Sequence, residues 1–142
     1  MISREVSLFI FYNEKGEILL QDRKRISKAG EEWGFFGGAL EDDESPKEAL
    51  KREVKEELNL DLNNDLQELG STVSSYFNGR QNQQVNLKRH IFTKKYSGEK
   101  IKILEGSGAK WFDLTTAKQL KLVPGDEGVV NIVSKYLEEK ND

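Results

Sequence analysis

The sequence predicts an α/β protein, an α/β/α sandwich in which helices cover both faces of a mixed β-sheet. The first two strand-like segments are so continuously apolar that both faces of their sheet should be covered. Two longer segments, residues 45–58 and 126–140, have the apolar spacing of helices. With 142 residues and 36% hydrophobic content, the chain can bury one core, so we expect a single domain over residues 1–142.

The chain is expected to open with a β-hairpin. Glu5–Tyr12 and Glu17–Arg23 are its strands, and Asn13–Gly16 is the turn between them. Ile26–Glu32 is polar and is expected to be a loop. Trp33–Phe36 then forms a short strand that leads into the first helix.

Residues 45–58 carry the start signals of a helix. Ser45 suits the N-cap, Pro46 suits the first helical position, and Glu48 completes a capping box of the Ser-x-x-Glu type. At about 100° per residue, apolar side chains fall in one stripe, which should be buried. These are Leu50, Val54 and Leu58, with Ala49 at the edge.

The second half of the chain is expected to add four strands and a final helix. Two strands flank Asn78-Gly79, and their polar connection at Gln81–Gln84 is long for a hairpin and is expected to overhang a pocket. The helix would bury its valines, Tyr136 and Leu137. In order, the elements are Leu66–Phe77, Val85–Tyr96, Ile101–Leu104, Lys110–Asp113 and the helix Asp126–Lys140.

Three glutamates lie close together on the first predicted helix. Glu53, Glu56 and Glu57 occupy positions i, i+3 and i+4, so their carboxylates form an acidic band beside the apolar stripe. Like charges at this spacing repel each other, and Mg²⁺ is commonly held by a few carboxylates together with substrate phosphates. A solvated helix face is the alternative. The helix's lysines lie on its outward side and the acids follow Gly37-Gly38, which favours a metal site.

The stretch from Gly38 to Leu60 resembles the Nudix box, Gly-x5-Glu-x7-Arg-Glu-apolar-x-Glu-Glu-x-Gly-apolar, the signature of the MutT/Nudix hydrolases. Asn59 stands where the family has its last glycine, which ends the helix in a left-handed conformation that Asn tolerates. The resemblance covers roughly Val6 to Leu137 and implies the Nudix fold, which is also an α/β/α sandwich. The matching positions are Gly38, Glu44, Arg52, Glu53, Val54, Glu56, Glu57 and Leu60.

The resemblance also implies roles for these residues and a cofactor. Glu53, Glu56 and Glu57 correspond to the family's metal-binding carboxylates, and the backbone carbonyl of Gly38 corresponds to a further ligand. The implied cofactor is Mg²⁺, for which Mn²⁺ can substitute. A supporting pair that braces the loop against the helix is also implied, although a purely structural ion pair fits it equally well; its members are Arg52 and Glu44.

Glu105 is a further candidate ligand. It lies six residues before Trp111 in a Gly-rich segment, similar to a loop in MutT-type members that supplies one more glutamate to the metals or to the attacking water. The alternative is an ordinary glutamate in a surface loop. Given the Nudix box, we expect Glu105 to belong to the site.

Four residues are candidates for substrate binding. Arg23 resembles a position that reaches phosphate or base, and Asp126 lies near a base-reading position, although helix N-capping explains Asp126 as well. Tyr76 falls sixteen residues past the box, a spacing linked in the family with dinucleoside polyphosphates. Phe35 would stack on a base, although a core role is commoner for such aromatics. The single histidine, His90, is expected to be structural or exposed and not catalytic.

The composition excludes several other classes. The chain has no cysteine, which excludes a thiol nucleophile, a disulfide framework and the cysteine-using isopentenyl diphosphate isomerase branch of the family. The net charge is −3 with both signs mixed along the chain, so no nucleic-acid polymer is expected as a partner. No signal-peptide pattern or span of membrane length is visible. We therefore expect a cytoplasmic protein with no membrane partner.

Together these features predict a magnesium-dependent diphosphohydrolase that acts on a small nucleotide derivative. A nucleoside triphosphate, such as an oxidised purine nucleotide, would give the monophosphate and pyrophosphate. Dinucleoside polyphosphates, ADP-ribose and nucleotide sugars remain alternative substrates, and a non-catalytic nucleotide-sensing regulator is the alternative class. The general base is either Glu53 or Glu105, and the rigid helix favours Glu53. The sequence leaves the oligomeric state open, with a homodimer as one option.

Overall fold

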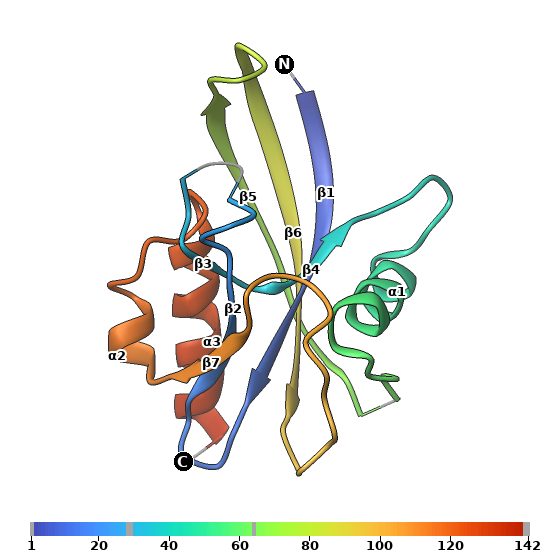
Figure 1. The fold of residues 1–142 in the computed structure, drawn as a ribbon, viewed down its shortest axis with the longest axis vertical. Coiled ribbons are helices and arrows are strands. Elements are labelled where there is room, and N and C mark those ends of the chain that lie inside the picture. The colour runs from blue at the N-terminus through green and yellow to red at the C-terminus, as the bar shows by residue number, and fades with distance from the viewer. Residues whose placement is uncertain (1, 28–29, 64, 141–142) are drawn as a thin grey trace.

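A mixed β-sheet runs through the centre of the molecule, with helices on both sides (Figure 1). The computed structural model describes residues 2–27, 30–63 and 65–140. Within these ranges the sheet has seven strands in the order β3-β2-β1-β6-β5, with β4 paired to β1 and β7 paired to β2. The strands are β1 Ile2–Tyr12, β2 Ile18–Asp22, β3 Trp33–Gly34, β4 Phe36–Ala39, β5 Gln67–Asn78, β6 Gln83–Lys95 and β7 Ala109–Phe112. The helices are α1 Pro46–Leu58, α2 Leu114–Ala117 and α3 Asp126–Lys140.

The pairing of β1 makes the sheet mixed. It runs parallel to β6 along its whole length, from Ile2 opposite Val85 to Tyr12 opposite Lys95. On its other edge it pairs antiparallel with β4, where Leu8 lies opposite Gly37. The predicted mixed sheet is therefore confirmed, and β4 places the Gly37-Gly38 pair directly against the central strand.

Two apolar clusters on opposite faces of the sheet hold the helices. Alternate β1 side chains point to opposite faces, so Phe9 and Phe11 pack with the α1 stripe, whereas Ile10 packs with the α3 valines. Residues Leu50, Val54 and Leu58 of α1 are fully buried, as the helical spacing predicts. Helices α1 and α3 lie on opposite sides of the sheet in Figure 1, which confirms the predicted sandwich.

Four local features of the structure differ from the sequence predictions. Ile101–Leu104 is not a strand, because the N–H groups of Lys102 and Leu104 donate to the last carbonyls of α1, those of Leu58 and Glu57, at 2.9 and 2.8 Å. The connection between β5 and β6 is a short turn at residues 79–82, and its tip projects beyond the body of the molecule (Figure 1). None of these four residues lines either of the two cavities described below.

The third difference is the short helix α2, which the sequence patterns did not predict. It begins where the Asp113 carboxylate accepts a hydrogen bond of 2.7 Å from the N–H of Thr116. The predicted strand Trp33–Phe36 is also divided at Phe35 into β3 and β4. Of the predicted loop at residues 26–32, residues 28–29 lie outside the described part of the chain. None of the helices described here is long and apolar enough to cross a membrane.

Candidate active site

Helix α1 begins and ends where its sequence predicts. The Ser45 hydroxyl accepts from the N–H of Glu48 at 3.1 Å, and the Glu48 carboxylate accepts from the N–H of Ser45 at 2.9 Å. At the other end Asn59 has φ 54°, and its N–H donates to the carbonyl of Lys55 at 3.0 Å. The left-handed end predicted for Asn59 is therefore confirmed, and both ends of the helix that carries the glutamates are fixed.

Glu57 is buried beneath the sheet, with only 3% of its surface exposed. Its carboxylate accepts a hydrogen bond of 2.7 Å from the N–H of Gly37. Burial, together with the nearby charges of Glu105 and Glu53, raises the pKa of Glu57 to about 8, against the effect of this hydrogen bond. A carboxylate in this environment favours either a proton or a cation as its partner.

Glu53 lies against the backbone of Gly38. A Cβ atom at position 38 would come within 2.5 Å of the Glu53 Cδ and within 2.7 Å of both carboxylate oxygens. Burial raises the pKa of Glu53, and the hydrogen bond and charge of Arg52 oppose that rise. Glycine at position 38 therefore gives the Glu53 carboxylate its room.

Arg52 holds the loop before α1 to the helix. Its Nε and Nη2 donate to the two carboxylate oxygens of Glu44 at 2.8 and 2.9 Å, and Nη2 also donates to the carbonyl of Ala39 at 3.0 Å. These hydrogen bonds hold the pKa of Glu44 well below its usual range, at about 2. The Arg52 guanidinium and the Glu44 carboxylate thus form a bidentate ion pair, which fixes the orientation of both side chains.

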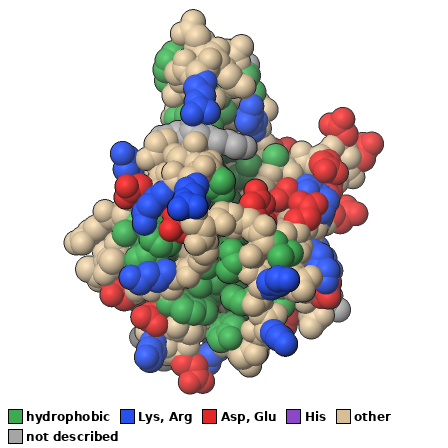
Figure 2. Space-filling view, viewed as in Figure 1, with side chains coloured by type: hydrophobic (Ala, Val, Ile, Leu, Met, Phe, Trp, Pro, Cys, Tyr) green, Lys and Arg blue, Asp and Glu red, His purple; other side chains and the backbone are tan. Residues whose placement is uncertain are grey.

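Arg52 also contacts two of the three clustered glutamates. Its Nη1 lies 2.7 Å from Oε1 of Glu53 and 3.6 Å from Oε1 of Glu56. The Glu56 side chain is 57% exposed, so it reaches this cluster from the solvent side. Figure 2 shows acidic side chains gathered on this flank of the molecule, over α1 and the loop before it.

Glu105 is delivered to the same region by the backbone. The extended segment before it is hydrogen-bonded to the end of α1 at Glu57 and Leu58, and this brings residue 105 beside the helix. The charge of Glu105 raises the pKa of both Glu53 and Glu57. The structure thus brings Glu53, Glu56, Glu57 and Glu105 to one side of the molecule.

The oxygen atoms of these glutamates are suitable ligands for a divalent cation, but their present arrangement does not form a complete metal site. In the described ranges, no three acidic or histidine side chains converge closely enough to hold one ion. Glu53 and Glu56 share Arg52 as their counter-charge, which draws them toward the guanidinium. The donors are carboxylate and carbonyl oxygens, the kind that Mg²⁺ prefers. Burial raises the pKa of Glu53 and Glu57, so their surroundings penalise the negative charge of both carboxylates.

A small cavity lies on the other side of the glycine pair. Its volume is about 170 Å³, and three of the four predicted substrate-binding residues, Arg23, Phe35 and Asp126, line it. Phe35 is 5% exposed and also belongs to the core cluster on the α3 side. The remaining lining residues are Val6, Leu8, Gly34, Gly37, Gly38, Leu87, Arg89 and Val123. Tyr76, the fourth candidate, is not among them.

Asp126 has a partner that the sequence analysis missed. The Nε of Arg89 lies 2.8 Å from Oδ1 of Asp126, and both side chains are almost completely buried. The other guanidinium nitrogens of Arg89 donate to the Ser74 hydroxyl and to the carbonyl of Pro124. Asp126 and Arg89 both line the cavity, so this ion pair forms part of its wall. Arg89 gave no signal in the sequence beyond its place in an apolar strand.

His90 is not among the residues that line this cavity. Its Nε2 is 2.8 Å from Oε1 of Glu5, across the pair of strands β1 and β6. This agrees with the structural role expected for it.

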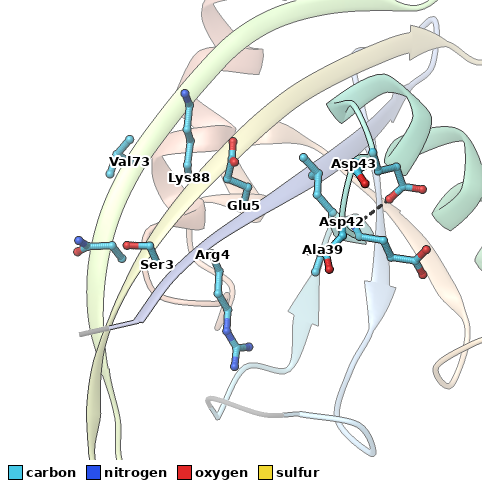
Figure 3. Close-up of a pocket in the computed structure, with 12 residues that line it drawn as sticks. Ser3, Arg4, Glu5, Ala39, Asp42, Asp43, Val73 and Lys88 are labelled. Atoms are coloured by element: carbon cyan, nitrogen blue, oxygen red, sulfur yellow. Dashed lines mark hydrogen bonds between the residues drawn. The ribbon is translucent and has the colours of Figure 1, made fainter.

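A larger and more open cleft of about 760 Å³ lies beside residues 41–44, the acidic loop before α1 (Figure 3). Figure 3 shows Glu5 and Lys88 on one side of the sheet and Arg4 on the other, with Asp42 and Asp43 across the cleft. Both basic and acidic side chains line this cleft. It lacks the apolar walls that usually hold a flat aromatic ligand, so the smaller cavity is the better place for a nucleobase.

The family to which the chain belongs follows from comparison with known proteins. The model of the NUDIX domain matches residues 1–131, so the chain belongs to the NUDIX domain family and is a Nudix hydrolase. The resemblance and the fold predicted from the box are thereby confirmed. Nudix hydrolases generally use a divalent metal ion. The comparison with curated protein sequences gave no match.

Solved structures with the same fold cover nearly the whole chain. The Escherichia coli ORF135 protein is 25% identical with a TM-score of 0.70, covering 95% of this chain and 91% of its own. The MutT protein from Methanosarcina mazei Go1 is 21% identical with a TM-score of 0.72, covering 99% and 97%. A binary complex of a Caenorhabditis elegans Ap4A hydrolase is 18% identical with a TM-score of 0.72, covering 96% and 98%. The chain thus shares the fold of these proteins over nearly its whole length.

Proposed function

We propose that this chain is a magnesium-dependent hydrolase of a nucleoside diphosphate derivative. The favoured substrate is a nucleoside triphosphate, including oxidised purine nucleotides, which would be cleaved to the monophosphate and pyrophosphate. One observation carries the proposal. Gly37 and Gly38 line the cavity that holds Phe35 and Asp126, and the same two glycines contact Glu57 and Glu53.

Because the Gly37-Gly38 backbone borders both the cavity and the glutamates, it indicates how the substrate would be oriented. A base in the cavity would leave its phosphates to pass over Gly37-Gly38 toward the glutamates. Arg23, which also lines the cavity, would offset part of the phosphate charge. The proposed binding residues are Arg23, Phe35 and Asp126. Tyr76 does not line the cavity, and the contact expected for it with a dinucleoside polyphosphate has no support there.

The size of the cavity suits a base better than a whole nucleotide. Pockets for drug-sized ligands begin at about 300 Å³, and this cavity is about 170 Å³. Phe35 supplies an apolar wall. Asp126, whose Oδ1 is held by Arg89, supplies a polar group at the wall that can read the N–H edge of a purine.

The metal would be held by the glutamates and a backbone oxygen. We assign Mg²⁺, or Mn²⁺ in its place, to Glu53, Glu56, Glu57, Glu105 and the carbonyl of Gly38. When bound, the ion would neutralise phosphate charge and lower the pKa of a water. Glu53, on the rigid helix, is the preferred base for the attacking water, and Glu105 is the alternative. Arg52 and Glu44 would keep Glu53 and the loop in place.

Two relatives define the alternatives. Structures with this fold include the C. elegans Ap4A hydrolase and the NUDIX domain of Shewanella oneidensis NrtR complexed with ADP ribose, which is 18% identical with a TM-score of 0.70, covering 96% of this chain and 88% of its own. Dinucleoside polyphosphates and ADP-ribose therefore belong in the substrate panel. Binding of one of these without turnover would instead support the nucleotide-sensing alternative.

The test is a substrate panel with matched variants. Nucleoside triphosphates, oxidised purine nucleotides, dinucleoside polyphosphates, ADP-ribose and nucleotide sugars are incubated with Mg²⁺ or Mn²⁺ at mildly alkaline pH, and products are separated by chromatography. Metal-dependent release of a monophosphate supports the proposal, with Glu57→Gln as the inactive control. Absence of turnover on every compound, with the protein folded, would refute it.

Two further predictions concern the setting of the protein, which are a cytoplasmic location and the lack of a nucleic-acid partner. The oligomeric state stays open, with a homodimer as one option. Light scattering during size-exclusion chromatography would give the molar mass directly and decide between monomer and dimer.

A further inference from the structure

A fully buried glutamine lies between the cavity and the turn at residues 105–108, here called the Glu105 turn. Gln21 lies on β2 and is 0% exposed. Its amide nitrogen donates to the backbone carbonyl of Glu105 at 3.1 Å, and its amide oxygen accepts from Nη1 of Arg23 at 2.8 Å. A buried amide is stable only when such partners are present. Both ends of this amide therefore meet groups that the proposed function places at the substrate or the metal.

Arg23 is fixed from a second direction. Its Nε lies 2.8 Å from Oε2 of Glu31, which is 2% exposed, and the other Glu31 oxygen accepts from the Ser27 hydroxyl at 3.0 Å. The aliphatic part of Arg23 crosses Gly34, where an added Cβ would lie 2.5 Å from the Arg23 Cδ. Two acceptors and a glycine platform thus leave the guanidinium little freedom to turn.

The Glu105 turn is packed just as closely on the end of β2. A Cβ at Gly106 would lie 2.8 Å from the carbonyl oxygen of Asp22 and 3.0 Å from the Gln21 Cγ. The N–H of Asp22 donates to the carbonyl of Gly108 at 2.9 Å. A shift of the Gln21 side chain would therefore be felt in this turn, next to Glu105.

We infer that Gln21 is a positioning residue that couples Arg23, on the cavity side, to Glu105, on the metal side. The inference rests on the proposed function and adds a residue that the Nudix box does not contain. The Gln21 amide holds the Arg23 guanidinium and the turn at Glu105 in one relative position. When Arg23 contacts phosphate, Glu105 is therefore held at a set distance from the bound substrate. Substrate binding and the placement of Glu105 are thereby linked.

Two substitutions test this link. Gln21→Met keeps a similar length and fills the buried space but removes both hydrogen bonds. Gln21→Glu keeps an acceptor for Arg23 and loses the donor to the Glu105 carbonyl. Gln67→Met is the control, because Gln67 is an exposed glutamine on β5 whose side chain bonds only to its neighbour's carbonyl among the contacts described. Thermal unfolding of each variant checks that the fold survives.

The readouts include binding as well as turnover. Without metal, affinity for a methylene-bridged nucleoside triphosphate analogue should fall about tenfold in Gln21→Met. It should also fall in Gln21→Glu, because the added carboxylate offsets the charge of Arg23. Affinity of the free protein for Mn²⁺, measured by electron paramagnetic resonance, should fall in Gln21→Met. In turnover, both variants should raise KM and lower kcat.

A double-mutant cycle tests the coupling itself. Arg23→Lys and Glu105→Gln should have non-additive effects on kcat/KM in the presence of Gln21, and additive effects on the Gln21→Met background. Additivity on both backgrounds, or Gln21 variants that behave like Gln67→Met, would overturn the inference while an active wild-type enzyme left the proposed function standing. A wild-type protein that hydrolyses nothing would refute the function instead, and the two binding measurements would still decide the role of Gln21.

Discussion

Replacing Glu57 by glutamine should stabilise the metal-free protein at alkaline pH while removing most of its activity. Burial raises the pKa of Glu57 from 4.5 to about 8. A tenfold change in a protonation equilibrium corresponds to about 1.4 kcal/mol, so ionising this carboxylate costs the folded protein on the order of 5 kcal/mol. Glutamine carries no charge, and its carbonyl oxygen can still accept the hydrogen bond from Gly37.

The direction of the pH dependence follows from proton linkage. The folded protein holds the Glu57 proton more tightly than the unfolded chain does, so this contribution to stability is complete below pH 4.5. It is lost as the pH rises to about 8, the pKa in the folded state. Wild-type stability in EDTA should therefore fall across this window, and that of Glu57→Gln should fall much less.

Thermal unfolding in EDTA from pH 4.5 to 9 measures the effect. Above pH 8 we expect Glu57→Gln to melt roughly 10 to 20 °C higher than wild type, and near pH 4.5 the two should coincide. Adding Mg²⁺ at pH 8 should stabilise wild type more than the variant, and turnover of the variant should fall at least tenfold. Glu138→Gln, at an exposed position of α3, is the control. Equal pH dependence in wild type and Glu57→Gln would refute the reasoning.

Three further substitutions test the neighbouring positions. Glu56→Gln should lower turnover at least tenfold without lowering the melting temperature, because the side chain is 57% exposed, and wild-type rates would contradict its assignment to the metal. Glu105→Gln should lower kcat by a smaller factor than Glu56→Gln does, or shift the pH–rate profile. No change in either would mean that Glu105 has no role in the site. Gly38→Ala should lower turnover at least tenfold, since the new Cβ would lie 2.5 Å from the Glu53 Cδ. Gly128→Ala in α3, where nothing lies within 4 Å, should keep full turnover, and equal activity of the two glycine variants would argue against the crowding.

Local signals in the sequence were sufficient for α1 and the residues it carries. The capping box at Ser45, the apolar stripe and the left-handed end at Asn59 all depend on contacts within a few residues, and all are present in the structure. Ile101–Leu104 was misread as a strand because its backbone partners are helix carbonyls some 45 residues away, at Glu57 and Leu58. A β-rich sequence pattern cannot distinguish such a segment from a paired strand.

The residues missed in the site share one property, which is that their partners are far away in the sequence. Gln21 bonds the carbonyl of Glu105 across 84 positions, and Arg89 pairs with Asp126 across 37. A glutamine or an arginine within an apolar strand gives no local sign of such a partner. The only available hint was the cost of burying a polar group, which requires that a partner exist without saying where.

The two glycines of β4 explain why a motif on a helix also requires a particular strand. At Gly37, with φ 130°, an added Cβ would lie 1.9 Å from the carbonyl oxygen of Ser7, so a side chain there is incompatible with the pairing of β4 to β1. At Gly38 the obstacle is the Glu53 carboxylate itself. The bare backbone therefore lets α1 approach closely enough for Glu57 to accept from the Gly37 N–H, while the opposite side of the same strand stays open to the cavity. In the proposed enzyme, only the backbone of Gly37 and Gly38 would separate the catalytic carboxylates from the bound base.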